Sequence, residues 1–281
     1  MLKEVRILDA GEVSPDVFGP WQQALAASFQ ACGIRAAVVP VADSLKPSAT
    51  DRSLTLAFNL TRVWSSANAN QFHLAWLVDH PSDHADLFFP QISHIPVNPA
   101  TCMVGSVDRH WLAFASDVYL YPNAHFLPHP CLCKSLTSPD WKDRDLDVVF
   151  IGSIEDTDML REDLLSNSGP FRPMLEALVE QYRFASGLLM EHALMDALRP
   201  FNLEKTQIVF AVNAFLQKLT RYHRMLERKR LFESIRRANI HVFGQGPWKK
   251  LKLSSNIHVH DRIPYGEAVQ VMTRAKILLN C

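Results

Sequence analysis

The stretch LDVVFIGS, from Leu146 to Ser153, is the clearest buried strand in the sequence, and it divides the chain into two halves. This apolar run ends on Gly152 and Ser153, where a long helix-favouring region begins. The segment before it, residues 131–145, is polar, contains a Ser-Pro pair and shows no clear period, which is typical of a linker. The sequence therefore predicts that a second α/β domain begins at this strand.

The first half of the chain alternates short apolar runs with helical or loop segments. Four apolar residues at helical spacing predict a helix that ends before Gly33, a residue suited to a helix C-cap. They are Trp21, Leu25, Phe29 and Cys32. Strands are expected at residues 5–10, 34–42, 53–60 and 72–79, with weaker candidates at 101–106 and 124–129.

The second half repeats the α/β pattern around a helical insertion that extends to about Arg237. Further strands are expected at residues 240–244, 256–263 and 275–281. Strands that alternate with helices predict βαβ units and mostly parallel sheets. We therefore expect two Rossmann-like domains, residues 1–135 and 146–281, and a second sheet that is incomplete because few strands are present.

The composition excludes several classes of protein. The formal net charge is zero, from 29 basic and 29 acidic residues, so no basic surface favours a nucleic-acid partner. Every apolar run is far shorter than the ~20 residues of a membrane span, and the N-terminus is a charged strand and not a signal peptide. Five irregularly spaced cysteines indicate a reducing cytoplasm.

Two strands of the second half end on small residues. Gly152 and Ser153 leave backbone N–H groups free, and Gly244 and Gly246 follow the next strand. In parallel sheets such carboxyl ends share one edge, where ligands bind. Gly244 and Gly246 either form a plain turn or leave the backbone without side chains so that a ligand can approach it closely. On the second hypothesis, Gly246→Ala would weaken ligand binding and leave the stability nearly unchanged.

Other motifs are weaker evidence for a catalytic or binding site. The G-x-G of this loop lacks the third glycine of a dinucleotide site, which would fall at Lys249. Asp79 and His80 follow a strand and are candidate general bases, although a capped helix start with surface histidines explains them equally. The D-x-D pairs, the lone C-x-C and the spacing of His80 and His84 do not form a convincing metal site, so none is expected.

Taken in order, these segments resemble the C-terminal half of GT-B glycosyltransferases, most closely the group-1-like family that includes the spore-maturation glycosyltransferases. The resemblance rests on DVVFIGS (147–153), an arginine-rich helical region, IHVFGQGPW (240–248) and NIHVHDRIPYGEAVQVMTRAKILLN (256–280). LVDHP (77–81) and FLPHP (126–130) are similar to the N-terminal half of bacterial members.

The resemblance implies a cytoplasmic transferase that moves a sugar from a nucleotide-sugar donor to a protein or glycan acceptor. It implies no metal, and no cofactor besides the donor as co-substrate. Asp79 or His80 would be the acceptor base of an inverting transfer, and His129 and Arg228 would face the interdomain cleft. The donor-binding residues would be Gly152, Ser153, Gly244, Gln245, Gly246, Trp248, Ile263, Tyr265, Lys276 and Asn280. The acidic donor-binding loop of the family would follow Asn280, beyond the end of this sequence.

Two other readings of the sequence remain open. The chain could be a non-catalytic GT-B-like binding module or a truncated pseudoenzyme that keeps the fold. It could also be an unrelated doubly wound enzyme such as an oxidoreductase, but the incomplete glycine pattern argues against a dinucleotide site.

Overall fold

The structure is a computed structural model that describes residues 2–9, 15–40, 52–58, 71–78, 100–117, 123–128, 139–182, 190–251 and 253–279. The chain divides into two compact units, Met1–Cys133 and Lys134–Cys281. The linker was expected at residues 131–145, and the division falls inside this segment.

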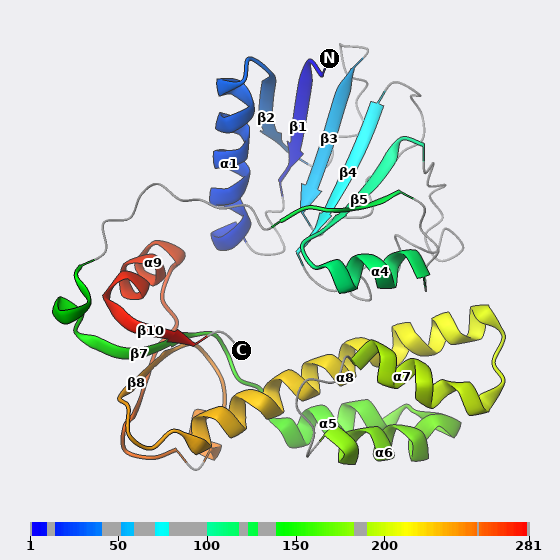
Figure 1. Cartoon of the computed structure of the whole chain (residues 1–281), viewed down its shortest axis with the longest axis vertical. Coiled ribbons are helices and arrows are strands. Elements are labelled where there is room, and N and C mark those ends of the chain that lie inside the picture. Colours follow the sequence, from blue (N-terminus) through cyan, green and yellow to red (C-terminus); the bar gives the residue numbers. More distant parts are fainter. Residues whose placement is uncertain are drawn as a thin grey trace. The chain divides into compact units, whose positions relative to one another are not determined.

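The first unit contains a six-stranded, fully parallel sheet (Figure 1). Its strand order is β2-β1-β3-β4-β5-β6. The strands are β1 (Glu4–Leu8), β2 (Arg35–Val39), β3 (Ser53–Phe58), β4 (Gln71–Leu77), β5 (Cys102–Ser106) and β6 (Ala124–Phe126). All six predicted strands are confirmed, including the two weaker candidates.

Two described helices accompany this sheet, α1 (Pro15–Ala31) and α4 (Arg109–Asp117). Helix α1 begins before the predicted apolar stripe and includes Pro20. It ends as expected before Gly33, whose φ of 76° is the left-handed conformation typical of the residue that follows a helix. Phe18 of α1 packs on Phe58 of β3, with ring centroids 5.8 Å apart, and so joins the helix to the sheet core.

The second unit contains a four-stranded parallel sheet with the order β10-β7-β8-β9. The strands are β7 (Leu146–Ile151), β8 (Ile240–Phe243), β9 (Ile257–His260) and β10 (Ala275–Leu279). The predicted α/β class with two parallel sheets is therefore confirmed.

The predicted helical insertion lies between β7 and β8, and its described residues form four α-helices, whose ribbons run beside one another in Figure 1. They are α5 (Thr157–Ser166), α6 (Arg172–Tyr182), α7 (Met190–Leu198) and α8 (Lys205–Ser234). A further helix, α9 (Tyr265–Arg274), connects β9 to β10. No helix within the described ranges is both long enough and apolar enough to cross a membrane.

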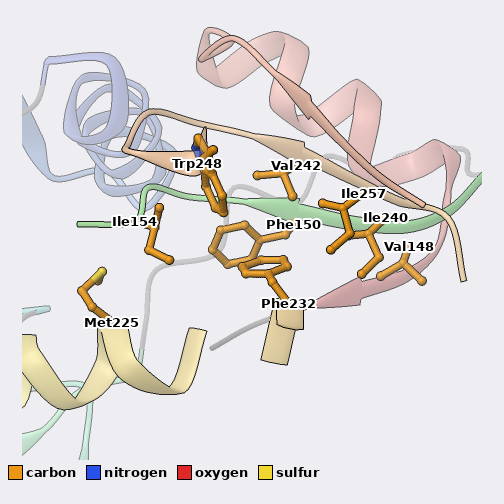
Figure 2. Close-up of a cluster of buried hydrophobic side chains, with 9 residues drawn as sticks. All are labelled: Val148, Phe150, Ile154, Met225, Phe232, Ile240, Val242, Trp248 and Ile257. Atoms are coloured by element: carbon orange, nitrogen blue, oxygen red, sulfur yellow. The ribbon is translucent and has the colours of Figure 1, made fainter. Parts of the chain in front are cut away.

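The main core of the second unit joins the sheet to the C-terminal part of α8. Phe232 of α8 is fully buried and contacts the rings of Phe150 and Trp248, at centroid distances of 5.1 and 5.4 Å (Figure 2). Burying one such aromatic side chain stabilises the fold by about 1.5–3 kcal/mol. Because the core contains Phe150 on β7 and Val242 on β8, it fixes where those two strands end.

Candidate functional site

The strand order of the second sheet identifies one edge as the candidate site. From β7 the chain passes to β8 and β9 on one side and then returns to β10 on the other side of β7. Ligands of open α/β sheets bind beyond the carboxyl ends of the strands at such a switch point. Gly152 and Ser153 directly follow β7 there, and Gly244, Gln245 and Gly246 follow β8.

The loops after β7 and β8 are hydrogen-bonded to each other. The Gly152 amide donates to Phe243 O at 3.0 Å, and the Ile154 amide donates to Gln245 O at 3.0 Å. The Gly244 amide donates to His260 O at 3.4 Å, which extends the pairing to β9. The two glycine-containing loops therefore form one continuous backbone layer.

This pairing explains the two glycines after β8. A Cβ on Gly244 would overlap the carbonyl of Gly152, and one on Gly246 would overlap the carbonyl of Ile154, both closer than the 3.0 Å that Cβ atoms keep from other atoms. Gly246 also has a φ of 144°, which L side chains rarely adopt. The expectation that Gly246→Ala leaves the stability nearly unchanged is therefore wrong, because the neighbouring loop already occupies the space that the alanine Cβ would need.

Trp248 also differs from expectation. Its exposed fraction is 6%, its ring packs on Phe232, and its Nε1 donates to Gly244 O at 3.3 Å. The predicted place of Trp248 in the wall of a nucleoside site is therefore wrong. The indole lies among the core side chains, as Figure 2 shows, and contacts the β8 loop through its hydrogen bond to Gly244 O.

Arg228 lies beside Ser153 at the carboxyl end of β7. Arg228 Nη1 donates to Ser153 O at 2.7 Å, and the guanidinium carbon lies 5.3 Å from the centre of the Phe150 ring. Helix α8 thus brings a permanent positive charge to the carboxyl end of β7. Ser153 and Gln245 are exposed at this edge.

Two further ion pairs hold the segment that follows Ser153. Arg221 of α8 forms a bidentate pair with Glu155, and this hydrogen bond lowers the pKa of the Glu155 carboxyl. Lys250 Nζ donates to Asp156 Oδ2 at 2.5 Å and lowers the pKa of that carboxyl. Asp156 is the N-cap of α5 and accepts a hydrogen bond from the Asp158 amide.

Lys276 lies at the opposite end of the strands from the candidate site. The register pairs Ala275 with Leu146, so Lys276 lies at the amino ends of the strands. Its Nζ donates to Asp147 Oδ1 at 2.8 Å, and this bond is the main cause of the lowered pKa of Asp147. The prediction that Lys276 binds the donor at the carboxyl edge is therefore wrong.

The other predicted residues divide into two groups. Ile263 and Tyr265 follow β9 at the carboxyl edge, where Tyr265 begins α9. Four predictions lie outside the described residues: Asp79, His80, His129 and Asn280. Within the described parts of the chain, no three His, Cys, Asp or Glu side chains are arranged to hold a metal ion.

Sequence reasoning missed Arg221, Glu155 and Lys250, which hold the β7–α5 loop. Arg221 belongs to a helical region rich in arginine, and Lys250 is one of two lysines that follow Trp248. Their acidic partners are far away in the sequence, and so the pairs could not be identified from it. Comparison of the chain with protein-family models, curated proteins and solved structures gives no match.

Proposed function

We propose that the chain is a metal-independent glycosyltransferase of the GT-B type, which transfers a sugar from a nucleotide-sugar donor to a protein or glycan acceptor. The proposal combines the resemblance of the sequence motifs with the arrangement of the second unit. The observation that carries it is the contact of Arg228 with Ser153 at the carboxyl end of β7, next to the switch point of the sheet.

The charge at this edge suits a diphosphate. Arg221 of α8 forms a bidentate pair with Glu155, and Arg224 and Arg228 of the same helix also act electrostatically on that carboxylate. Arginine stays protonated at neutral pH and binds phosphate oxygens with fixed geometry. Positive charge placed in advance stabilises the negative charge that develops on a leaving diphosphate, which is the main electrostatic requirement of sugar transfer from such a donor.

The neighbouring residues support recognition of the rest of the donor. Ser153 and Gln245 offer exposed polar groups, and Ile263 and Tyr265 are half-buried after β9. In this proposal the glycines shape the loops and do not themselves contact the donor, because their Cβ positions are occupied by protein backbone. The contact of Arg228 with Ser153 is equally consistent with a second candidate function, a GT-B-like module that binds a nucleotide without transferring its sugar.

A binding experiment with the full chain tests the proposal. Calorimetric titration with UDP, GDP and the matching nucleotide sugars, in buffer containing a chelator, is expected to show saturable binding of at least one ligand. Arg228→Gln should weaken binding at least about tenfold, which corresponds to about 1.4 kcal/mol. Arg228→Lys should restore part of the affinity because it keeps the charge.

The matched control is Lys218→Gln, which removes a positive charge of α8 that pairs with Asp163 of α5. This variant should bind like the parent protein. Melting temperatures of all variants show whether the folds are intact. No binding of any nucleotide, or equal binding by Arg228→Gln and the parent, would overturn the proposal, and binding without sugar transfer would support the non-catalytic module.

A further inference from the structure

Three histidines share one face of the second sheet. The register pairs His241 of β8 with His258 of β9 and Phe243 of β8 with His260 of β9. Because side chains alternate along a strand, His241, His258 and His260 project from the same side, opposite the buried Ile240 and Val242. We call these three residues the histidine cluster.

The three imidazoles are in direct contact. His241 Nδ1 and His260 Nε2 lie 3.0 Å apart, which is a hydrogen-bond distance. The ring of His258 is 5.1 Å from that of His241, and the ring of Phe243 stacks on His260 at 4.5 Å. Protonation of one ring therefore affects the others.

The hydrogen bond between His241 and His260 limits how many protons the pair can hold. Between two neutral rings, one nitrogen carries the hydrogen and the other accepts it. One additional proton keeps the bond, because an imidazolium still donates to a neutral ring. A second additional proton must enter at the accepting nitrogen, so two N–H groups then face each other and the bond is lost.

The surrounding groups only partly offset this repulsion. From β7, Asp147 faces the cluster, but it already accepts hydrogen bonds from Lys276 and Asn239. Asp145 is paired with Arg274 at the end of α9. Burial and the two neighbouring histidines outweigh these carboxylates, and together they lower the pKa of His241.

We propose that the histidine cluster makes strand β9 acid-labile, so that β9 separates from β8 once His241 and His260 are both charged. In the described sheet β9 pairs only with β8, and so its release costs a single ladder of hydrogen bonds. Since the Gly244 amide donates to His260 O, release of β9 also removes this hydrogen bond from the loop after β8. This inference does not depend on the proposed function.

Amide hydrogen exchange on the full chain tests the proposal, with β7 as the internal reference. Between about pH 7.5 and pH 5.5, after correction for chemical exchange, the β9 amides should exchange at least about tenfold faster relative to those of β7, because opening is linked to proton uptake. His260→Gln keeps a hydrogen-bonding side chain that cannot be protonated, and so it should remove most of this increase. His192→Gln changes an exposed histidine of α7 and should leave the increase unchanged.

A second variant covers the case in which His260→Gln does not fold. His258→Gln keeps the bond between His241 and His260 and removes a neighbouring charge that lowers the pKa of His241, so it should shift the onset of β9 opening to higher pH. Ring-nitrogen NMR titration of the parent should show His241 accepting its proton at a lower pH than exposed histidines do, because burial and the neighbouring histidines lower its pKa. Acid-independent exchange of β9, or the same increase in both cluster variants as in the parent, would overturn the proposal.

Discussion

We predict that Gly244→Ala destabilises the second unit, because the added Cβ meets the carbonyl of Gly152. That carbonyl belongs to the backbone after the central strand β7, so it cannot rotate away as a flexible side chain can. The two loops must separate to make room, and the hydrogen bonds of the Gly152 and Ile154 amides to the β8 loop must lengthen.

The expected loss follows from these two effects. Overpacking against a rigid neighbour costs about 1–3 kcal/mol, and each weakened backbone hydrogen bond costs about 0.5–1.5 kcal/mol. Because two such bonds are weakened, we expect a loss of about 2–6 kcal/mol in the free energy of unfolding. For a chain of this size, at roughly 2–4 °C per kcal/mol, such a loss corresponds to a fall in the melting temperature of roughly 4–24 °C.

Thermal unfolding followed by circular dichroism measures this fall, and Gly266→Ala provides the matched control. A Cβ on Gly266 meets no other atom within 4 Å, and this residue lies in helix α9. The control should gain about 0.5–1 kcal/mol, because alanine favours the helix. If Gly244→Ala melts at the same temperature as the parent, the tight packing of the two loops is not the reason for the glycine.

Three further changes have outcomes that the structure predicts. Phe232→Ala should cost about 3–5 kcal/mol in a urea titration, since it empties the centre of the core between Phe150 and Trp248; a loss below about 1 kcal/mol would contradict that packing. Glu155→Gln should cost less than about 1 kcal/mol, because its pair with Arg221 is partly exposed. Since the folded pKa of Glu155 is lowered from 4.5, the stability from this pair should be present above about pH 4.5 and be lost as the pH falls further, so the parent and the variant should converge in acid unfolding curves. Burial lowers the pKa of His73 below 6.5, so the first unit should lose stability as the pH falls below about 6.5, and NMR titration should show His73 accepting its proton at a lower pH than exposed histidines do.

The local sequence determined much of the fold. Apolar runs alternating with helical segments predicted both parallel sheets, and all six strands of the first unit lie where they were expected. Gly33 was also placed correctly, as the residue that follows the end of a helix. These features depend on residues within a few positions of one another, and a single sequence contains that information directly.

The roles of individual residues at the site were decided by tertiary structure. Gly244 and Gly246 follow a strand, as predicted. Only the tertiary structure shows that the backbone of the neighbouring loop fills the space where their Cβ atoms would lie. Trp248 lies in the core because α8 brings Phe232 against it, and Lys276 lies at the far edge because the register pairs β10 with β7 from their amino ends.

The charge pairs and the histidine cluster have the same origin. Arg221 meets Glu155 across 66 positions of sequence, and His241 meets His260 across 19. Both contacts depend on strand order, register and the course of α8, which arise from the packing of the whole second unit. Residue type and spacing alone determined the elements and the edge at which their loops gather, whereas long-range packing determined which side chains meet there and which become part of the core.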